Sequence, residues 1–377
     1  METNALHRDG IKLFYVNPMS YSNLSEYDYS LLSNIEDLHG YYISSSKYNQ
    51  SKIDGFVRYE LYSYSDKKGL NKVISYIASQ LKLIHLTMII KPDIIHCQWH
   101  KIPLFDVIIY RFIKAICSTV KIIHTAHNIL PHNSGNKFKS IYSFYYKFVD
   151  MVITHHFSTS RELIHEYGLS SKNIFTSKHG LFPVRETISE GSDQNRLFNS
   201  GKVFGLLGTI GFYKGIDLLV ETWVRHESKI NQNDINLIIA GAGIIPNSTA
   251  IKNNPRVKII NRYLTNSEFE GILLQCDCIL LPYAKISQSG MLMKAISNNL
   301  PVVVSNEGGL TEPFKYGKVG EIMPEYTVDG LFKAIELVKD NLHNEKYSAH
   351  EFELVKSEYS WRKISANYTK LYEELVQ

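Results

Sequence analysis

The sequence predicts an α/β protein with two doubly wound, Rossmann-like parallel sheets. Short runs of β-branched and aromatic residues alternate with longer segments of helical apolar period, which is typical of βαβ units. A polar stretch without apolar periodicity, residues 186–202, separates two such series. The length of 377 residues also fits more than one domain. Ligands of such sheets bind beyond the carboxyl ends of the strands, so we expect the functional residues in loops that follow strands.

The predicted elements divide the chain into a first domain at 1–185, a linker at 186–202, a second domain at 203–357 and a closing helix at 358–377. In the first domain we expect strands at 11–16, 93–98, 121–125 and 151–154, and helices at 70–90 and 138–150. In the second we expect strands at 203–207, 236–240, 257–260, 278–281 and 301–305, and helices at 214–226, 289–298 and 328–341. Apolar residues at helical spacing predict an amphipathic helix at 360–376.

Composition excludes several classes of protein. Hydrophobic residues make up 44% and charged residues 21% of the chain, which argues against disorder. The 41 basic and 37 acidic residues leave a net charge of +4, too small to predict a nucleic-acid partner. Four cysteines are too few for a disulfide scaffold. With no secretory signal and no uninterrupted apolar stretch of about 20 residues, we expect a cytoplasmic protein that does not cross a membrane.

The glycine-rich stretch at residues 208–215, GTIGFYKG, lies between a predicted strand and a predicted helix. Glycines allow the backbone to approach a ligand, and a helix N-terminus attracts anions. Lys214 would add a positive charge to such a site. The alternative interpretation is an ordinary turn with a solvated lysine.

Two further turns follow strands of the second domain. Gln288, Ser289 and Gly290 stand where a helix is expected to begin, so Ser289 can cap the helix and Gly290 leaves N–H groups accessible to a phosphate. The segment 301–312, PVVVSNEGGLTE, places a Gly-Gly turn after the next strand. An ordinary helix cap is the alternative interpretation for Ser289. Three such turns in one domain favour a nucleotide diphosphate as the ligand.

These stretches resemble motifs of the glycosyltransferases with the GT-B fold, particularly family 4, whose members are mostly retaining enzymes that use nucleotide-sugar donors. The resemblance is best from residue 203 to 312. There, FGLLGTIGFYKG is similar to the family's glycine-and-lysine motif, and SQSG with NLPVVVSNEGGLTE to its donor-sugar and diphosphate loop. PDIIHCQW and HTAHN resemble two strands of the family's first domain. YSWRKISANYTKLYEEL resembles its closing helix, which crosses back onto the first domain.

The resemblance implies two sets of site residues and a UDP-sugar or GDP-sugar as substrate. The donor-binding residues would be Gly208, Thr209, Lys214, Gly241, Tyr263, Leu264, Gln288, Ser289, Gly290, Gly308, Gly309 and Glu312. The acceptor-binding residues would be Asn17, His96, Trp99 and His127. Lys214 and His127 would be catalytic: Lys214 neutralises the leaving diphosphate, and His127 becomes the general base if the enzyme inverts. No cofactor and no metal is expected, because the family generally uses lysine and helix N-termini instead.

Two residues depart from the family pattern. Gly211 stands where the motif has an arginine, which removes a fork that would bind phosphate. Lys294 stands where the donor helix commonly has a glutamate, and a lysine cannot accept hydrogen bonds from sugar or ribose hydroxyls. Lys294 either replaces part of the lost positive charge or is a solvated helix residue.

Other chemistries find little support in the residues. No glycine occurs at 17–20, directly after the first strand, which argues against the dinucleotide fingerprint of a dehydrogenase. Cys276 and Cys278 have no second ligand pair and no H-E-x-x-H motif is present, so no metal site is predicted. Several histidines in or beside strands are expected on residues alone to be structural: His96, His124, His155 and His156.

The segment 101–147 carries seven basic residues against one acidic residue. Within and just beyond it, aromatic and apolar residues recur at helical spacing beside lysines: Phe138, Ile141, Tyr142, Tyr145 and Phe148. A basic aromatic face of this kind suits an anionic membrane surface. The alternative is a stripe that faces the core, with a solvated lysine edge.

The sequence therefore predicts a hexosyltransferase of the polysaccharide-biosynthesis type that moves a sugar from a nucleotide-diphosphate sugar to a hydroxyl acceptor. The resemblance implies a glycan or polyprenyl-linked glycan acceptor, a retaining outcome and a peripheral position at the inner face of the cell membrane. A nucleotide-sugar epimerase of the same fold and a catalytically lapsed binding scaffold are the alternatives. The departures at Gly211 and Lys294 are the features that favour the lapsed scaffold.

Overall fold

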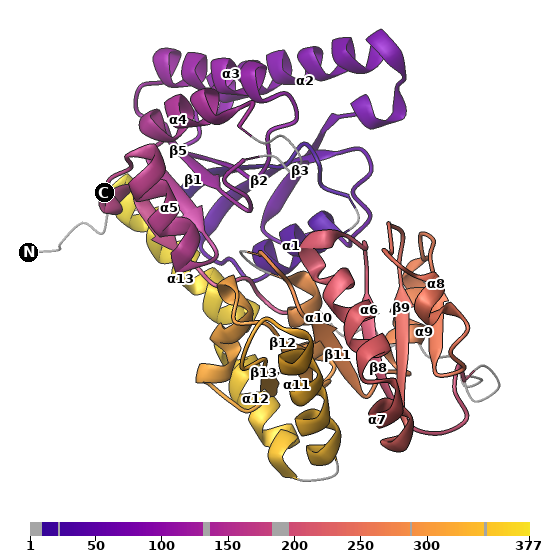
Figure 1. Cartoon of the computed structure of the whole chain (residues 1–377). Helices are drawn as coiled ribbons and strands as arrows, with labels where there is room; N and C mark the ends of the chain where they lie inside the picture. Colours follow the sequence, from indigo (N-terminus) through magenta and orange to yellow (C-terminus); the bar gives the residue numbers. More distant parts are fainter. Residues whose placement is uncertain (1–9, 22, 131–135, 183–195, 287–288, 343–344) are drawn as a thin grey trace, which may run out of the picture. The chain divides into compact units, whose positions relative to one another are not determined.

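The computed structural model describes residues 10–377 apart from 22, 131–135, 183–195, 287–288 and 343–344 (Figure 1). The chain forms two compact units. The first comprises Met1–Gly180 and Trp361–Gln377, and the second comprises Leu181–Ser360. Gln288 and most of the expected linker lie outside the described residues.

The first unit is built on a seven-stranded sheet in the order β3-β2-β1-β4-β5-β6-β7, in which every pair is parallel. Its strands are β1 Ile11–Val16, β2 Leu38–Ser45, β3 Phe56–Tyr62, β4 Ile94–Cys97, β5 Lys121–Thr125, β6 Met151–Thr154 and β7 Ile174–Thr176. Its α-helices are α1 Asn23–Leu32, α2 Gly69–Ile90, α3 Pro103–Ile116, α4 Lys139–Phe148, α5 Phe157–Tyr167 and α13 Trp361–Val376. Helices α2 to α5 pack on one face of the sheet, and α1 and α13 on the other.

The second unit is built on a six-stranded parallel sheet in the order β10-β9-β8-β11-β12-β13. Its strands are β8 Lys202–Leu207, β9 Ile235–Ala240, β10 Val257–Ile260, β11 Cys278–Leu281, β12 Val302–Val304 and β13 Gly320–Ile322. Its α-helices are α6 Ile216–Arg225, α7 Glu227–Gln232, α8 Thr249–Lys252, α9 Asn266–Leu273, α10 Gly290–Ser297, α11 Val328–Asn341 and α12 Ala349–Glu358. Helices α6, α7, α8 and α11 cover one face, and α9, α10 and α12 the other.

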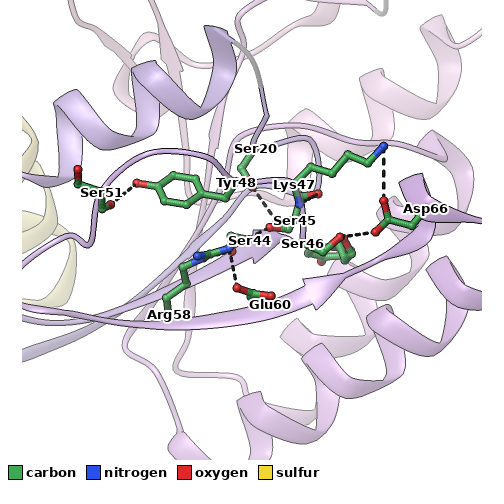
Figure 2. A network of polar contacts seen from close by, with 11 residues as sticks. Ser20, Ser44, Ser45, Ser46, Lys47, Tyr48, Ser51, Arg58, Glu60 and Asp66 are labelled. Atoms are coloured by element: carbon green, nitrogen blue, oxygen red, sulfur yellow. Dashed lines mark hydrogen bonds and ion pairs between the residues drawn. The ribbon is translucent and has the colours of Figure 1, made fainter.

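The predicted fold class is confirmed, and most of the predicted strands are present within one or two residues of the expected bounds. Strands β2, β3, β7 and β13 were not predicted. Strand β2 ends in two serines whose polar groups are satisfied inside the unit (Figure 2). Ser44 accepts a hydrogen bond from Arg58 Nε at 2.9 Å, and Ser45 N donates to Ser20 Oγ at 2.7 Å. The helix expected at 214–226 begins two residues late, because Gly215 takes a left-handed conformation with φ 70°.

Helix α2 corrects the expectation that no segment is long and apolar enough for a membrane span. Among the described residues, α2 alone passes that test of length and composition. One face of α2 nevertheless packs within the first unit. Ser79 Oγ donates to Leu61 O at 2.6 Å, and Gln80 Nε2 donates to Asp106 Oδ1 at 2.8 Å. Helix α2 is therefore part of the layer that covers the first sheet.

The aromatic stripe of helix α4 faces the core and not a surface. Tyr142 and Tyr145 are buried in the cluster beneath α2 to α5. Lys139 at the edge of the stripe forms an ion pair with Glu166, with 2.8 Å between Nζ and Oε2. The membrane interpretation of this stripe is wrong, and the core-facing alternative is confirmed.

Helix α13 completes the core on the α1 side of the first sheet. Its apolar face buries Tyr368 and Leu371, and Ser365 Oγ donates to Leu31 O at 2.8 Å. The hydroxyl of Tyr372 lies 2.7 Å from Nδ1 of His96, which is fully buried. The last helix therefore supplies a hydrogen-bond partner to a histidine at the centre of the sheet.

Tyr372→Phe should destabilise the first unit by about 1–3 kcal/mol, because it leaves a buried ring nitrogen of His96 without this partner. Urea unfolding followed by circular dichroism measures the change. Tyr263→Phe is the matched control, since the Tyr263 side chain is 85% exposed. Equal unfolding free energies for wild type and Tyr372→Phe would contradict the assigned role of this hydrogen bond.

Candidate functional site

The predicted glycine-and-lysine motif forms the loop after β8. Gly208 has φ 92°, a conformation that favours glycine, and Thr209 is exposed. A 3₁₀ turn, Phe212–Lys214, follows, and Gly215 begins helix α6. A Cβ atom on Gly208 would lie 3.3 Å from Nζ of Lys214, so this glycine leaves room for the ammonium group.

Lys214 is buried, with 9% of its surface exposed. Its Nζ lies 3.5 Å from Leu207 O and 5.7 Å from the centre of the Tyr283 ring. Within the part of the chain that the structure describes, no carboxylate forms an ion pair with Lys214. Burial lowers the pKa of Lys214 to about 8. The solvated-lysine alternative is therefore wrong, and the site holds a desolvated cation without a counter-ion from the described residues.

The loop after β11 lies directly against the loop after β8. Ala284 N donates to Tyr213 O at 2.8 Å. A Cβ atom on Gly215 would lie 1.9 Å from Pro282 O, so only glycine fits there. Tyr326 Oη donates to the same carbonyl at 3.2 Å. Two motifs that are some 70 residues apart in sequence thus form one structure at the carboxyl edge of the sheet.

The loop after β9 joins the same edge through Gly241. Gly208 N donates to Ala240 O at 2.9 Å, and a Cβ atom on Gly241 would lie 2.0 Å from Gly208 O. With φ 147°, Gly241 adopts a conformation that other residues rarely take. The resemblance placed Gly241 beside the nucleotide, and the structure gives it a packing role that is independent of any ligand.

Helix α10 and the turn after β12 complete the set of loops. Ser289 caps α10, its Oγ accepting from Leu292 N at 3.3 Å, as both interpretations of this turn predicted. Ser305 Oγ donates to Tyr283 O at 2.6 Å and ties the β12 turn to the β11 loop. Gly308, with φ 50°, and Gly309 begin the 3₁₀ helix Gly308–Lys315, which also contains Glu312.

The residues expected near the base lie after β10. Tyr263 is 85% exposed, and Leu264 is half-buried against the α9–α10 side of the core. Arg262 beside them pairs with Glu268, 2.6 Å apart. An exposed aromatic ring at this edge of the sheet is available for stacking.

Lys294 fits neither of its two expected roles. Its Nζ lies 2.6 Å from Oε1 of Glu270, and the two side chains are 11% and 17% exposed. Glu270 belongs to α9 and Lys294 to α10, so the pair joins two neighbouring helices. The positive charge is neutralised within the protein, and Lys214 remains the cation at the motif.

In the first unit, His127 follows β5 and packs face to face on Trp99. The ring centres are 4.7 Å apart and the planes differ by 3°. Gln98 Oε1 lies 3.0 Å from His127 Nε2. Burial lowers the pKa of His127 well below its usual value, and the neighbouring His155 and His179 act in the same direction. The ring is therefore neutral at neutral pH.

Three residues around His127 were not predicted: Gln98, Tyr27 and His179. Tyr27 from α1 makes edge contacts with His127 at 5.0 Å and His155 at 5.7 Å, and His179 lies 5.0 Å from the same tyrosine ring. Gln98 could have been recognised, because it ends a predicted strand. Tyr27 and His179 come from distant segments, and no local pattern marks them.

Two residues predicted to bind the acceptor, Asn17 and His96, have their polar side-chain atoms hydrogen-bonded inside the first unit. Asn17 Nδ2 donates to Asp28 Oδ2 at 2.7 Å, and its Oδ1 accepts from Met19 N at 2.9 Å. His96 lies 2.7 Å from Thr125 Oγ1 through Nε2, besides its contact with Tyr372. Both are buried, Asn17 to 1% exposure, so the structure corrects their assignment to acceptor binding and supports a structural role.

Asp28 organises the segment that follows β1. It accepts hydrogen bonds from Tyr15 Oη at 3.0 Å and Tyr42 Oη at 2.6 Å, besides the one from Asn17. Burial raises the pKa of Asp28 to about 7, and these three bonds oppose the rise. A cavity of about 330 Å³ opens nearby and is lined in part by Tyr42, Tyr48 and Arg58. Arg58 pairs with Glu60 at 2.9 Å, so its charge is balanced (Figure 2).

Comparison with known proteins gives a family match within the second unit. Residues 201–341, in the second unit, match the family model described as glycosyl transferases group 1. No protein of curated function matches the sequence.

Solved structures match nearly the whole chain. A glycosyltransferase from Rickettsia africae ESF-5 is 14% identical, with 97% of this chain and 98% of that chain covered and a TM-score of 0.69. The chain has the GT-B fold. The catalytic domain of starch synthase IV from Arabidopsis thaliana, bound to ADP and acarbose, is 12% identical, with 98% and 100% covered and a TM-score of 0.71. Anabaena Alr3699/HepE in complex with UDP is 12% identical, with 97% and 100% covered and a TM-score of 0.66.

Acid should destabilise the first unit through its buried histidines. Burial lowers the pKa of His155 to about 3, whereas an unfolded histidine titrates near 6.5. The stability that neutral His155 contributes is therefore complete above about pH 6.5 and is lost as pH falls towards 3. When the pH falls from 7.5 to 5.0, the unfolding free energy of His155→Gln should decrease by about 2 kcal/mol less than that of wild type. The opposing titration of Asp28 is common to both proteins and cancels.

Urea unfolding at pH 7.5 and 5.0 measures this difference. His165→Gln is the matched control, because His165 is exposed on α5. The same pH dependence in His155→Gln and wild type would show that His155 does not remain neutral in the folded unit.

Proposed function

We propose that this protein is a glycosyltransferase that binds a UDP-sugar or GDP-sugar and transfers the sugar to a hydroxyl acceptor. The observation that carries the proposal is Lys214, a buried cation with no ion-pair partner among the described residues. It lies where the loops after β8, β9 and β11 meet at the carboxyl edge of the second sheet. A diphosphate is the ligand whose charge such a cation would balance. The match of residues 201–341 to glycosyl transferases group 1 supports the same chemistry.

The proposed reaction uses Lys214 to stabilise the charge that develops on the leaving diphosphate. The capped N-terminus of α10 and the Gly308–Gly309 turn would supply main-chain N–H donors. We propose a retaining outcome from the resemblance to family 4. His127, held by Gln98 and stacked on Trp99, would line the acceptor side, and it would act as general base only if the enzyme inverts.

We further propose that the acceptor is lipid-linked and that helices α2 and α3 rest on an anionic membrane. Exposed apolar residues recur along both helices and define the α2–α3 apolar face: Leu70, Ile74, Ile77, Leu81, Met88, Leu104, Ile108 and Phe112. Leu70 is 73% exposed, and Leu81 and Ile108 are 58% and 54% exposed. Residues 67–91 contain five lysines and no acidic residue. An apolar face beside lysines is complementary to anionic lipid.

Two alternatives make different predictions for the same donor. An epimerase would convert the donor sugar without an acceptor, and a lapsed scaffold would bind nucleotide without turnover. The intact loops around Lys214 favour a working donor site. Incubating UDP- and GDP-sugars with and without acceptor, followed by NMR of the sugar, separates the three.

Binding of UDP or GDP should raise the pKa of Lys214 from about 8, because the negative diphosphate favours the charged lysine. Wild type should therefore take up about 0.1 proton at pH 7 and about 0.8 proton at pH 8.5 on binding. Isothermal titration in buffers of different ionisation enthalpy measures this uptake. Lys214→Met should bind the diphosphate at least 10-fold more weakly and take up no proton.

Two controls accompany this titration. Uridine and guanosine lack the diphosphate and should give no proton uptake. Lys285→Met removes an exposed lysine that lies close to Tyr283 in sequence and should behave as wild type. Tight diphosphate binding by Lys214→Met would place the donor site elsewhere.

Ile74→Glu combined with Ile108→Glu should release the protein from phosphatidylglycerol vesicles, because each places a carboxylate on the α2–α3 apolar face. Both residues are more than half exposed, so the fold should be retained. Co-sedimentation at low salt measures binding, with phosphatidylcholine vesicles for comparison. Val224→Glu with Leu354→Glu is the charge-matched control, because both are exposed apolar residues of the second unit. Unchanged sedimentation of the α2–α3 variant would exclude this face as the membrane contact.

A further inference from the structure

Three ligating side chains meet in the core of the first unit, on the face covered by α2 to α5. They are Cys97 at the end of β4, His100 in the loop before α3, and His124 in β5. One ligand atom from each lies within 4.8 Å of the other two. Their exposed fractions are 0%, 7% and 3%. The three groups come from segments that only the parallel pairing of β4 and β5 brings together.

The histidines of this cluster have unsatisfied nitrogen atoms. Within the described part of the chain, both ring nitrogens of His100 and Nδ1 of His124 have no hydrogen-bond partner. A buried polar atom without a partner costs about 1–3 kcal/mol, and native proteins contain few of them. His96, on the opposite face of the same strand, has both nitrogens satisfied by Thr125 and Tyr372. His100 and His124 therefore differ from His96, whose two buried ring nitrogens both have hydrogen-bond partners.

We propose that Cys97, His100 and His124 bind a thiophilic divalent cation of the Zn²⁺ class. One thiolate with two imidazoles is a common ligand set for Zn²⁺. The cation would engage the nitrogen lone pairs that have no other partner and would link β4, β5 and the start of α3. The site is separate from the candidate donor site, and its existence does not rest on the proposed function.

The two imidazoles are neutral and available as ligands, whereas the thiol must lose its proton when the cation binds. Burial lowers the pKa of His100 to about 3 and that of His124 well below its usual value, so both rings are neutral at neutral pH. Burial raises the pKa of the Cys97 thiol to about 12. On binding, the sulfur forms its bond to the cation and releases its proton to solvent, which leaves one compensating negative charge in the site.

The distances require a small contraction. Zn²⁺ ligands at about 2.0–2.3 Å stand roughly 3.3–3.8 Å from one another in a tetrahedral site, so the three ligand atoms must approach by about 1 Å. The rings of His100 and His124 are stacked, 4.9 Å apart with planes differing by 19°, so one ring must turn to direct its lone pair at the cation. Tyr145 packs edge-on against His100, with ring centres 4.5 Å apart. Its buried hydroxyl has no hydrogen-bond partner among the described residues.

The site would also support the candidate acceptor residues. Cys97 directly precedes Gln98, and His124 lies three residues before His127. Gln98 and His127 contact each other at 3.0 Å. A cation beneath them would fix the two strand ends from which these residues project.

The test uses the full chain refolded with Zn²⁺ or Co²⁺ and dialysed against metal-free buffer. Wild type should retain one equivalent of metal, and the cobalt form should show a thiolate-to-metal charge-transfer band. Cys97→Ser should abolish that band and weaken Zn²⁺ binding at least 100-fold in competition with a chromophoric chelator, and His124→Gln should also weaken it. Cys117→Ser and His85→Gln are matched controls outside the cluster and should retain wild-type binding.

X-ray absorption at the zinc edge tests the wild-type protein directly, even if a variant fails to fold. It should show one sulfur at about 2.3 Å and nitrogen at about 2.0–2.1 Å from zinc. The proposal is overturned if refolded wild type retains no metal, if the absorption spectrum contains no sulfur ligand, or if Cys97→Ser binds Zn²⁺ as tightly as wild type.

Discussion

The candidate donor site depends on the direct backbone contact between loops at the carboxyl edge of the second sheet. Gly241 packs against the carbonyl of Gly208, and Gly215 against that of Pro282, at distances that leave no space for a Cβ atom. These contacts fix the turn that carries Lys214. The glycines therefore do more than leave room for a ligand, because they allow three loops to form one rigid edge.

Desolvation lowers the pKa of buried basic groups in both units. In the second unit it leaves Lys214 as a weakened cation whose pKa a bound anion would restore. In the first unit it keeps His127, His155 and His179 neutral. The same physical effect thus leaves one unit with a cation whose charge an anionic ligand would favour, and the other with neutral imidazoles that resist protonation.

Polar contacts inside the protein explain why buried Lys294 and Asn17 are compatible with the fold. Lys294 would be a costly buried charge by itself, but its ion pair with Glu270 balances it between two helices. Asn17 and Asp28 similarly satisfy each other beneath the loop after β1. The hydrogen bond to Asp28 occupies the side-chain amide of Asn17, a residue that the resemblance assigned to the acceptor.

The sequence by itself determined the two parallel sheets and the position of the glycine-and-lysine motif, because both are written in local patterns. The alternation of short apolar runs with helical periods defined the strands, and GTIGFYKG marked the turn after β8. Strand β2 was not predicted, because its buried serines find hydrogen-bond partners such as Arg58 and Ser20 only in the tertiary structure. The tertiary structure alone decided the burial of Lys214, the partner of Lys294 and the meeting of Cys97 with His124. Each of these depends on contacts between segments far apart in the chain, and parallel pairing brings such segments to one edge or one core without any trace in the local pattern of residues.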